Sequence, residues 1–164
     1  MRLTAGLDSG PVCARGRELI GARDTYGSLA PRMAELGAEL LLSALATRPE
    51  WIEQDDALAT YAEKISPQDR WLDPSRPAVE LERTVRALTP HVGAFVLLED
   101  GSRLGVHVAT VIPAPAGDLH QGVLSLERPR PVLHCAVQAL ALDVVQPPGR
   151  RLMSGEDYLR GLHR

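Results

Sequence analysis

Aromatic residues and long apolar runs are scarce in this sequence. Only 4% of the 164 residues are aromatic, so we expect a mostly aliphatic core and few side chains on which nucleic-acid bases could stack. Apolar runs such as Leu40-Leu41-Leu42 are far too short to span a bilayer, and the first residues lack the apolar core of a signal peptide. We therefore expect a cytoplasmic protein outside the membrane.

Cysteine and lysine are also rare. Cys13 and Cys135 are the two cysteines, and we interpret them as reduced thiols, with a disulfide as the alternative. His134 adjoins Cys135, but a zinc site needs three or four ligands, so we expect no metal. Lys64 is the single lysine, and the other cations are arginines, which bind phosphate in a forked geometry.

Charge is distributed unevenly along the chain. The formal net charge is -3. Residues 1–67 hold seven Lys or Arg against ten Asp or Glu, whereas residues 68–164 hold eleven of each. Net charge alone therefore does not indicate nucleic-acid binding, and any such binding would have to come from local clusters of cations. The sequence also has no GxSxG motif and no P-loop.

Periodicity predicts helices in the first half of the chain. Apolar residues recur at spacings of three and four over 25–46, which predicts a long helix with a stripe of Leu29, Met33, Leu36, Leu40 and Ala44. A second helix follows Ser75, its predicted cap, with one face made of Ala78, Leu81, Val85 and Leu88. Ahead of the long helix, we expect a strand at 1–4, a turn, and a half-buried strand at 12–17.

Beyond Pro90 the period changes to two. Strands at 95–99 and 103–112 flank Asp100-Gly101, a tight-turn signal, and one face of the second strand should comprise Leu104, Val106, Val108 and Thr110. Further short strands are expected at 122–126, 131–136 and 139–145, which together predict a small barrel. Ser154 to Asp157 form a capping box that predicts a closing helix. The fold class is α+β.

The heptapeptide GLDSGPV, residues 6–12, places Asp8 between two glycines. Glycines on both sides indicate a sharp turn or a close approach to a ligand. In such a turn, Asp8 either bonds to its own backbone near Gly10 or acts as a catalytic acid or base. The heptapeptide alone leaves both interpretations open.

Three stretches together carry a resemblance to a known family. They are GLDSGPV, then TYAEKISPQDRWLDPSRPAVELERTVRALTPHVGAF at 60–95, and QPPGRRLMSGEDYLRG at 146–161. In this order and spacing they resemble methionyl-tRNA formyltransferase, over essentially the whole chain. The chain departs from the family at Leu72-Asp73-Pro74 and at 90–94, which concerns packing at the domain junction more than chemistry.

The resemblance implies a domain organisation. Residues 1–47 would be the C-terminal part of a doubly wound α/β catalytic domain, 48–65 a connector, and 66–164 an OB-like β-barrel domain with flanking helices. The family's catalytic asparagine and histidine, and its Ser-Leu-Leu-Pro loop that holds folate, precede these segments and are not in this sequence. We therefore expect a C-terminal fragment that is inactive alone, with residues 1–47 mobile, self-associated or repacked.

The resemblance also implies site residues. The family transfers a formyl group from 10-formyltetrahydrofolate to the methionine of initiator tRNA, and Asp8 matches the aspartate that orients the catalytic histidine. Lys64, Arg150 and Arg151 match cations that face the tRNA. The full enzyme would be monomeric and metal-free. Two alternatives remain: a non-catalytic RNA-binding module, and a related folate-dependent formyl transferase or hydrolase.

Overall fold

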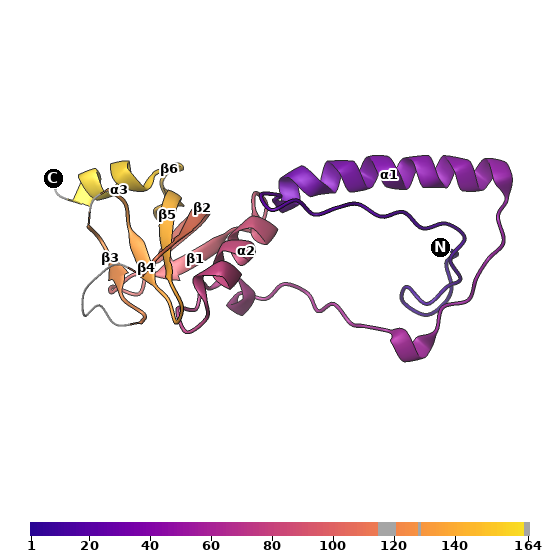
Figure 1. Cartoon of the computed structure of the whole chain (residues 1–164), viewed down its shortest axis with the longest axis horizontal. Helices are drawn as coiled ribbons and strands as arrows, with labels where there is room; N and C mark the ends of the chain where they lie inside the picture. The colour runs from indigo at the N-terminus through magenta and orange to yellow at the C-terminus, as the bar shows by residue number, and fades with distance from the viewer. Residues whose placement is uncertain (115–120, 128, 163–164) are drawn as a thin grey trace. The chain divides into compact units, whose positions relative to one another are not determined.

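The computed structural model describes residues 1–114, 121–127 and 129–162. The chain divides into two compact units, one made of residues 1–24 and 28–64 and the other of residues 25–27 and 65–164. Helices and an antiparallel sheet are both present, as the α+β class predicts (Figure 1). The three domain boundaries expected from the sequence stay a prediction.

The first unit contains most of one long helix and little other regular structure. Helix α1, Tyr26–Thr47, and the 3-10 turn η1, Asp56–Leu58, are its helical elements. The long helix is confirmed. The strands predicted at 1–4 and 12–17 are wrong, because no strand is assigned there and the segment 12–17 forms only one bridge, between Val12 and Ile52. A strand completes its hydrogen bonds with a neighbouring strand. Residues 1–64 supply only the single bridge between Val12 and Ile52.

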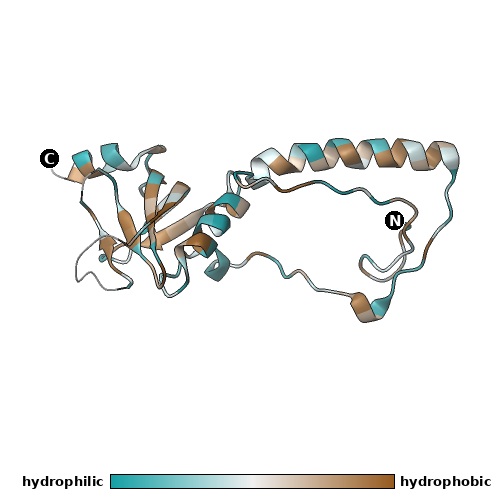
Figure 2. Ribbon diagram, in the orientation of Figure 1, coloured by the Kyte–Doolittle hydropathy of each residue, from teal (hydrophilic) through white to brown (hydrophobic). Residues whose placement is uncertain are grey.

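Burial is low throughout residues 1–64. Only Gly10 and Pro11 are buried there, and α1 has no buried residue although apolar side chains recur along it (Figure 2). Leu36 and Leu40 are half-buried where the extended segment at Gly16 passes, since a β-carbon on Gly16 would lie 2.9 Å from each side chain. The predicted apolar stripe exists: Leu29, Leu36, Leu40 and Ala44 are half-buried and Met33 is exposed, but none of the five is fully buried.

The second unit is built on one antiparallel sheet. Its strands run in the order β1-β2-β5-β4-β3, with β6 paired to β5. Their bounds are β1 Ala94–Leu97, β2 Arg103–Ile112, β3 Leu124–Ser125, β4 Val132–His134, β5 Ala139–Gln146 and β6 Met153–Ser154. Among the strands that the structure describes, β1 and β3 do not pair, so the sheet is open and the predicted barrel closure is not confirmed.

Helices α2, Ala78–Leu88, and α3, Gly155–Leu162, complete this unit. The predicted stripe of α2 is confirmed residue by residue, since its buried side chains are Ala78, Leu81, Val85 and Leu88. They belong to an aliphatic core that also includes Leu104, Val106, Leu142 and, from α3, Leu159. At about 25 cal/mol per Å² of apolar surface, this core is the main source of stability in the unit.

The face predicted for β2 is correct for only half of the strand. Leu104 and Val106 are buried, but Val108 is 48% exposed. The register against β5 shifts twice, between Val106 and Val108 and again between Val108 and Ala109, as at a β-bulge. One extra residue turns the following side chains to the other face, so Ala109 and Val111 pack against the core instead of Val108 and Thr110.

Of three local signals in this unit, the turn at Asp100-Gly101 and the cap of α3 are confirmed, and the predicted cap of α2 is wrong. The hairpin turns at 98–102, where Gly101 has a positive φ of 78° and Asp100 Oδ1 accepts a hydrogen bond from the Ser102 amide at 2.9 Å. Ser154 caps α3, because its hydroxyl accepts from the Asp157 amide at 3.0 Å. Ser75 does not cap α2: the helix begins three residues later, after Pro77, which makes no side-chain cap hydrogen bond.

Candidate functional site

The loop of residues 1–10 presents Asp8 on a constrained backbone. Asp8 has a φ of 51°, a left-handed conformation that is uncommon outside glycine. The Gln54 side-chain amide donates to the Asp8 carbonyl at 2.8 Å and to the Gly10 carbonyl at 2.7 Å. A β-carbon on Gly10 would lie 1.9 Å from the Arg2 carbonyl oxygen, so only glycine permits this close approach. The second glycine of the motif is therefore required by the turn.

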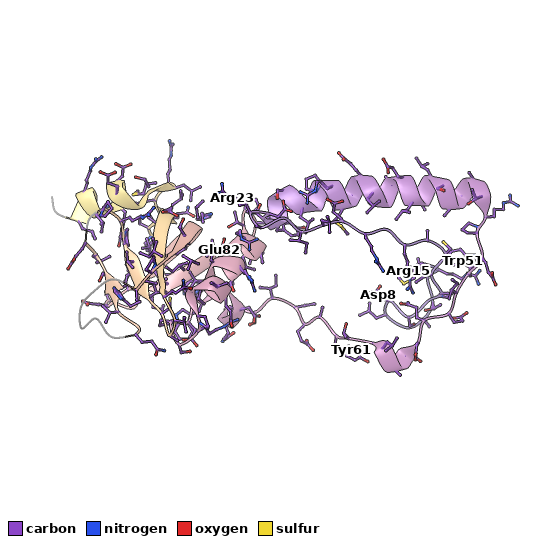
Figure 3. The ribbon with its side chains drawn as sticks, in the orientation of Figure 1. Asp8, Arg15, Arg23, Trp51, Tyr61 and Glu82 are labelled. Atoms are coloured by element: carbon purple, nitrogen blue, oxygen red, sulfur yellow. The ribbon has the colours of Figure 1, made fainter. Side chains whose placement is uncertain are left out.

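The Asp8 carboxylate is exposed (Figure 3). Within the part of the chain that the structure describes, no hydrogen bond or ion pair holds this carboxylate, including the bond to backbone near Gly10 that the turn interpretation requires. The geometry thus leaves the carboxylate available for a partner. Its catalytic role stays a prediction.

Residues 1–10 line a cavity of about 280 Å³. Its walls contain no aromatic side chain, and no charged or polar side chain in it is buried. Pockets that bury a ligand of folate's size are commonly about 300–1,000 Å³ and mostly apolar. The described residues of this loop therefore offer a folate no buried polar group that would orient it.

The predicted basic residues lie on exposed segments. Lys64 is exposed and is the last residue of the first unit. Arg150 and Arg151 are exposed on the loop between β5 and β6 in the second unit. Lys64 therefore belongs to one compact unit and the arginine pair to the other.

The loop that carries the arginine pair has a fixed local geometry. The Arg150 amide donates to the Pro147 carbonyl at 3.1 Å, and the Gln146 side-chain amide donates to the Arg150 carbonyl at 3.0 Å. Pro147 is buried, and Gly149 has a positive φ of 67°. The backbone is thus held in a tight turn while both guanidinium groups remain accessible to an anion.

Sequence reasoning missed a second basic feature beside this loop. A cleft of about 340 Å³ is lined by Arg70 and Arg103 together with residues 90–95, 105, 107 and 146–149. The two arginines are far apart in the chain and share no motif, so no spacing rule could have joined them. The glycines at 93 and 149, which have a positive φ in the structure, were the available sequence signals of an unusual local backbone.

His134 is the last residue of β4, and Cys135 follows it directly. His134 is buried with its Nε2 atom 3.1 Å from the Ser125 hydroxyl. Burial raises the pKa of the Cys135 thiol to about 11, so this cysteine stays protonated and is a poor ligand at neutral pH. Among the described residues, no three His, Cys, Asp or Glu side chains are grouped to hold a metal ion.

In the same described ranges, no helix is both long enough and apolar enough to cross a membrane.

Known proteins resemble this chain over nearly its full length. A family model described as formyl transferase, C-terminal domain, matches residues 64–163. The methionyl-tRNA formyltransferase of Gluconobacter oxydans is 37% identical over 161 residues, which cover 98% of this chain and 52% of that protein. Proteins of the same name from Acidithiobacillus ferrooxidans and Granulibacter bethesdensis are each 39% identical, over 165 and 163 residues that cover 98% of this chain and 52% and 50% of those proteins.

The chain therefore spans about half the length of the curated relatives it matches. The match of the family model covers more than half of the 164 residues, including the whole sheet and helices α2 and α3. This chain belongs to the formyl transferase family, whose C-terminal domain it contains.

Proposed function

We propose that these residues are the C-terminal portion of a methionyl-tRNA formyltransferase, which moves a formyl group from 10-formyltetrahydrofolate to the amino group of methionine on initiator tRNA in the cytoplasm. The observation that carries the proposal is the family match over 64–163 together with relatives of that name at 37–39% identity. The predicted domains, 1–47, 48–65 and the OB-like 66–164, and a monomeric full enzyme belong to the same proposal.

Asp8 is the one catalytic residue proposed in this chain. Its exposed carboxylate would accept a hydrogen bond from a histidine outside these residues, orient that imidazole, and stabilise its cationic form while the methionine amine loses a proton. The chain contains no asparagine, the residue type that stabilises the oxyanion in the family. The exposed loop of residues 1–10 offers a folate no buried polar group. The 164 residues alone should therefore be inactive.

The second proposed role is binding of initiator tRNA by Lys64, Arg150 and Arg151. The support is geometric: all three cations are exposed, and the turn at 147–150 holds the arginine pair on one loop. Adjacent guanidinium groups on an exposed loop can contact two phosphates. Binding through so few cations should be weak and should fall steeply with salt.

A salt-titrated filter assay tests the tRNA contacts. We expect initiator tRNA to bind at low salt. The double variant Arg150→Ala with Arg151→Ala should bind more weakly, and the slope of log affinity against log salt concentration should become shallower by about 1 to 2. Arg76→Ala with Arg83→Ala is the matched control, because it removes the same charge from α2 and the residue before Pro77. Equal affinities of the test variant and the unchanged chain would remove the arginine pair from the site.

A non-catalytic RNA-binding module is the second candidate. It is favoured by the location of the aliphatic core, whose buried members all lie within residues 65–164. Both candidates bind RNA, so binding cannot separate them. They differ in whether joining these residues to the other half of a relative yields formyl transfer.

A further inference from the structure

The cleft beside the arginine loop contains two cations that no carboxylate neutralises. Arg70 donates from Nε to the Gly93 carbonyl at 3.0 Å, which fixes the side chain and leaves its two terminal nitrogens for other acceptors. The Arg103 guanidinium carbon lies 4.5 Å from the centroid of the Phe95 ring. Stacking on a ring occupies the face of a guanidinium and leaves its N–H edge open to an anion.

Some arginines of the second unit are neutralised by carboxylates, whereas Arg83, Arg150 and Arg151 form no ion pair within the described residues either but do not line the cleft. Four arginines pair with carboxylates: Arg76 with Glu80, Arg86 with Glu82, Arg130 with Asp143, and Arg160 with Glu156 and Asp157. Among the described residues, neither Arg70 nor Arg103 forms an ion pair, and no acidic residue lines the cleft. Two fixed cations without a counter-ion in a concave site favour an external anion.

Backbone geometry shapes the cleft between these arginines. His107 is the extra residue of the β2 bulge, and its Nε2 atom lies 3.3 Å from the Gln146 side-chain oxygen. Bulges commonly re-aim a side chain beside a functional site. A volume of about 340 Å³ can hold a phosphate with its attached sugar.

The cleft is continuous with the loop of Arg150 and Arg151. Gly149 belongs to both, since it lines the cleft and directly precedes Arg150. Two arginines that line the cleft, together with the two that follow Gly149 in the chain, fit a series of phosphates better than a single carboxylate. We infer that Arg70 and Arg103 form a phosphodiester-binding cleft for an RNA backbone, which adds to the phosphate contacts proposed for Arg150 and Arg151. The choice of RNA rests on the proposed function.

Arg70→Gln and Arg103→Gln test the inference in the full chain. Initiator tRNA and an unrelated RNA hairpin of equal length are the probes. We expect each variant to weaken binding of both RNAs about tenfold, because a phosphate contact does not depend on base sequence, and to lower the salt slope by about 1. Arg83→Gln, an exposed arginine on α2 outside the cleft, should change affinity less than twofold.

Arg103 is exposed at the start of β2, so Arg103→Gln should leave the fold intact. This variant therefore tests the inference even if Arg70→Gln perturbs the fold. Affinity losses no larger than that of Arg83→Gln would overturn the inference, and so would competition by poly-glutamate as strong as that by RNA. Failure of the proposed function would give a different result. These residues joined to the N-terminal half of a relative would then show no formyl transfer, while the cleft variants would still weaken RNA binding.

Discussion

Asp24 organises the polar contacts that precede α1. Its carboxylate accepts from both terminal nitrogens of Arg32, at 3.0 and 2.8 Å, from the Ser28 hydroxyl at 2.7 Å, and from the Gly21 amide at 2.7 Å. Arg32 also bonds to Glu18 at 2.7 Å. These donors, Arg32 first, hold the pKa of Asp24 well below its ordinary value.

The pH dependence of these contacts follows from the direction of that pKa shift. Because the folded-state pKa is below the unfolded value of about 4, the contacts add stability above that pH and lose it as the pH falls through the folded value. We expect the Gly21 amide and the first turn of α1 to lose NMR exchange protection between about pH 5 and pH 2. Asp24→Asn should lack this transition, and an unchanged transition in that variant would contradict the role of Asp24.

At the residue scale, the residues that could be predicted from the sequence are those that lie in a recognisable motif. Asp8 and Gly10 stand out in GLDSGPV, and the structure explains Gly10 by the close approach of the Arg2 carbonyl. Arg70 and Arg103 carry no motif, because their relation depends on the fold and on the packing of Arg103 against Phe95. A cleft built from distant residues cannot be read from spacing along the chain.

Helix α3 offers two glycines with opposite surroundings. A β-carbon on Gly155 would lie 2.2 Å from the Leu142 carbonyl oxygen and 2.9 Å from Pro131 Cδ, whereas one on Gly161 would meet nothing within 4 Å. We expect Gly155→Ala to destabilise the second unit by about 1–3 kcal/mol through overpacking. Gly161→Ala should stabilise it by up to about 1 kcal/mol through helix propensity. Urea unfolding measures both, and equal midpoints for the two variants would refute the packing of α3 on β5.

At the element scale, the sequence predicted the helices better than the sheet. The stripe of α2 is correct at each position because a helix forms its hydrogen bonds within its own segment. The β2 face fails after Val106 because the bulge depends on the partner strand, which local alternation cannot reveal. The strands predicted at 1–4 and 12–17 fail for a related reason: alternation indicates a strand only where neighbouring strands exist.

The whole molecule combines one unit that has a core with another that has almost none. In residues 1–64 only Gly10 and Pro11 are buried, while the aliphatic core lies in 65–164. We expect amide hydrogen exchange in the intact chain to be fast over 1–64, with partial protection in α1, and slow in β2, β5 and α2. Global protection of α1 equal to that of β5 would contradict the expectation that residues 1–47 do not form a stable core alone.

Formyl transfer by a joined enzyme tests the central claim most directly. The N-terminal half of the Gluconobacter oxydans relative would precede these 164 residues, and transfer to charged initiator tRNA would be measured with 10-formyltetrahydrofolate. We expect the joined enzyme to formylate, Asp8→Ala to reduce its rate about 100-fold or more, and the 164 residues alone to show no transfer. Transfer by the 164 residues alone, abolished by Asp8→Ala, would contradict the claim that the partners of Asp8 lie outside them.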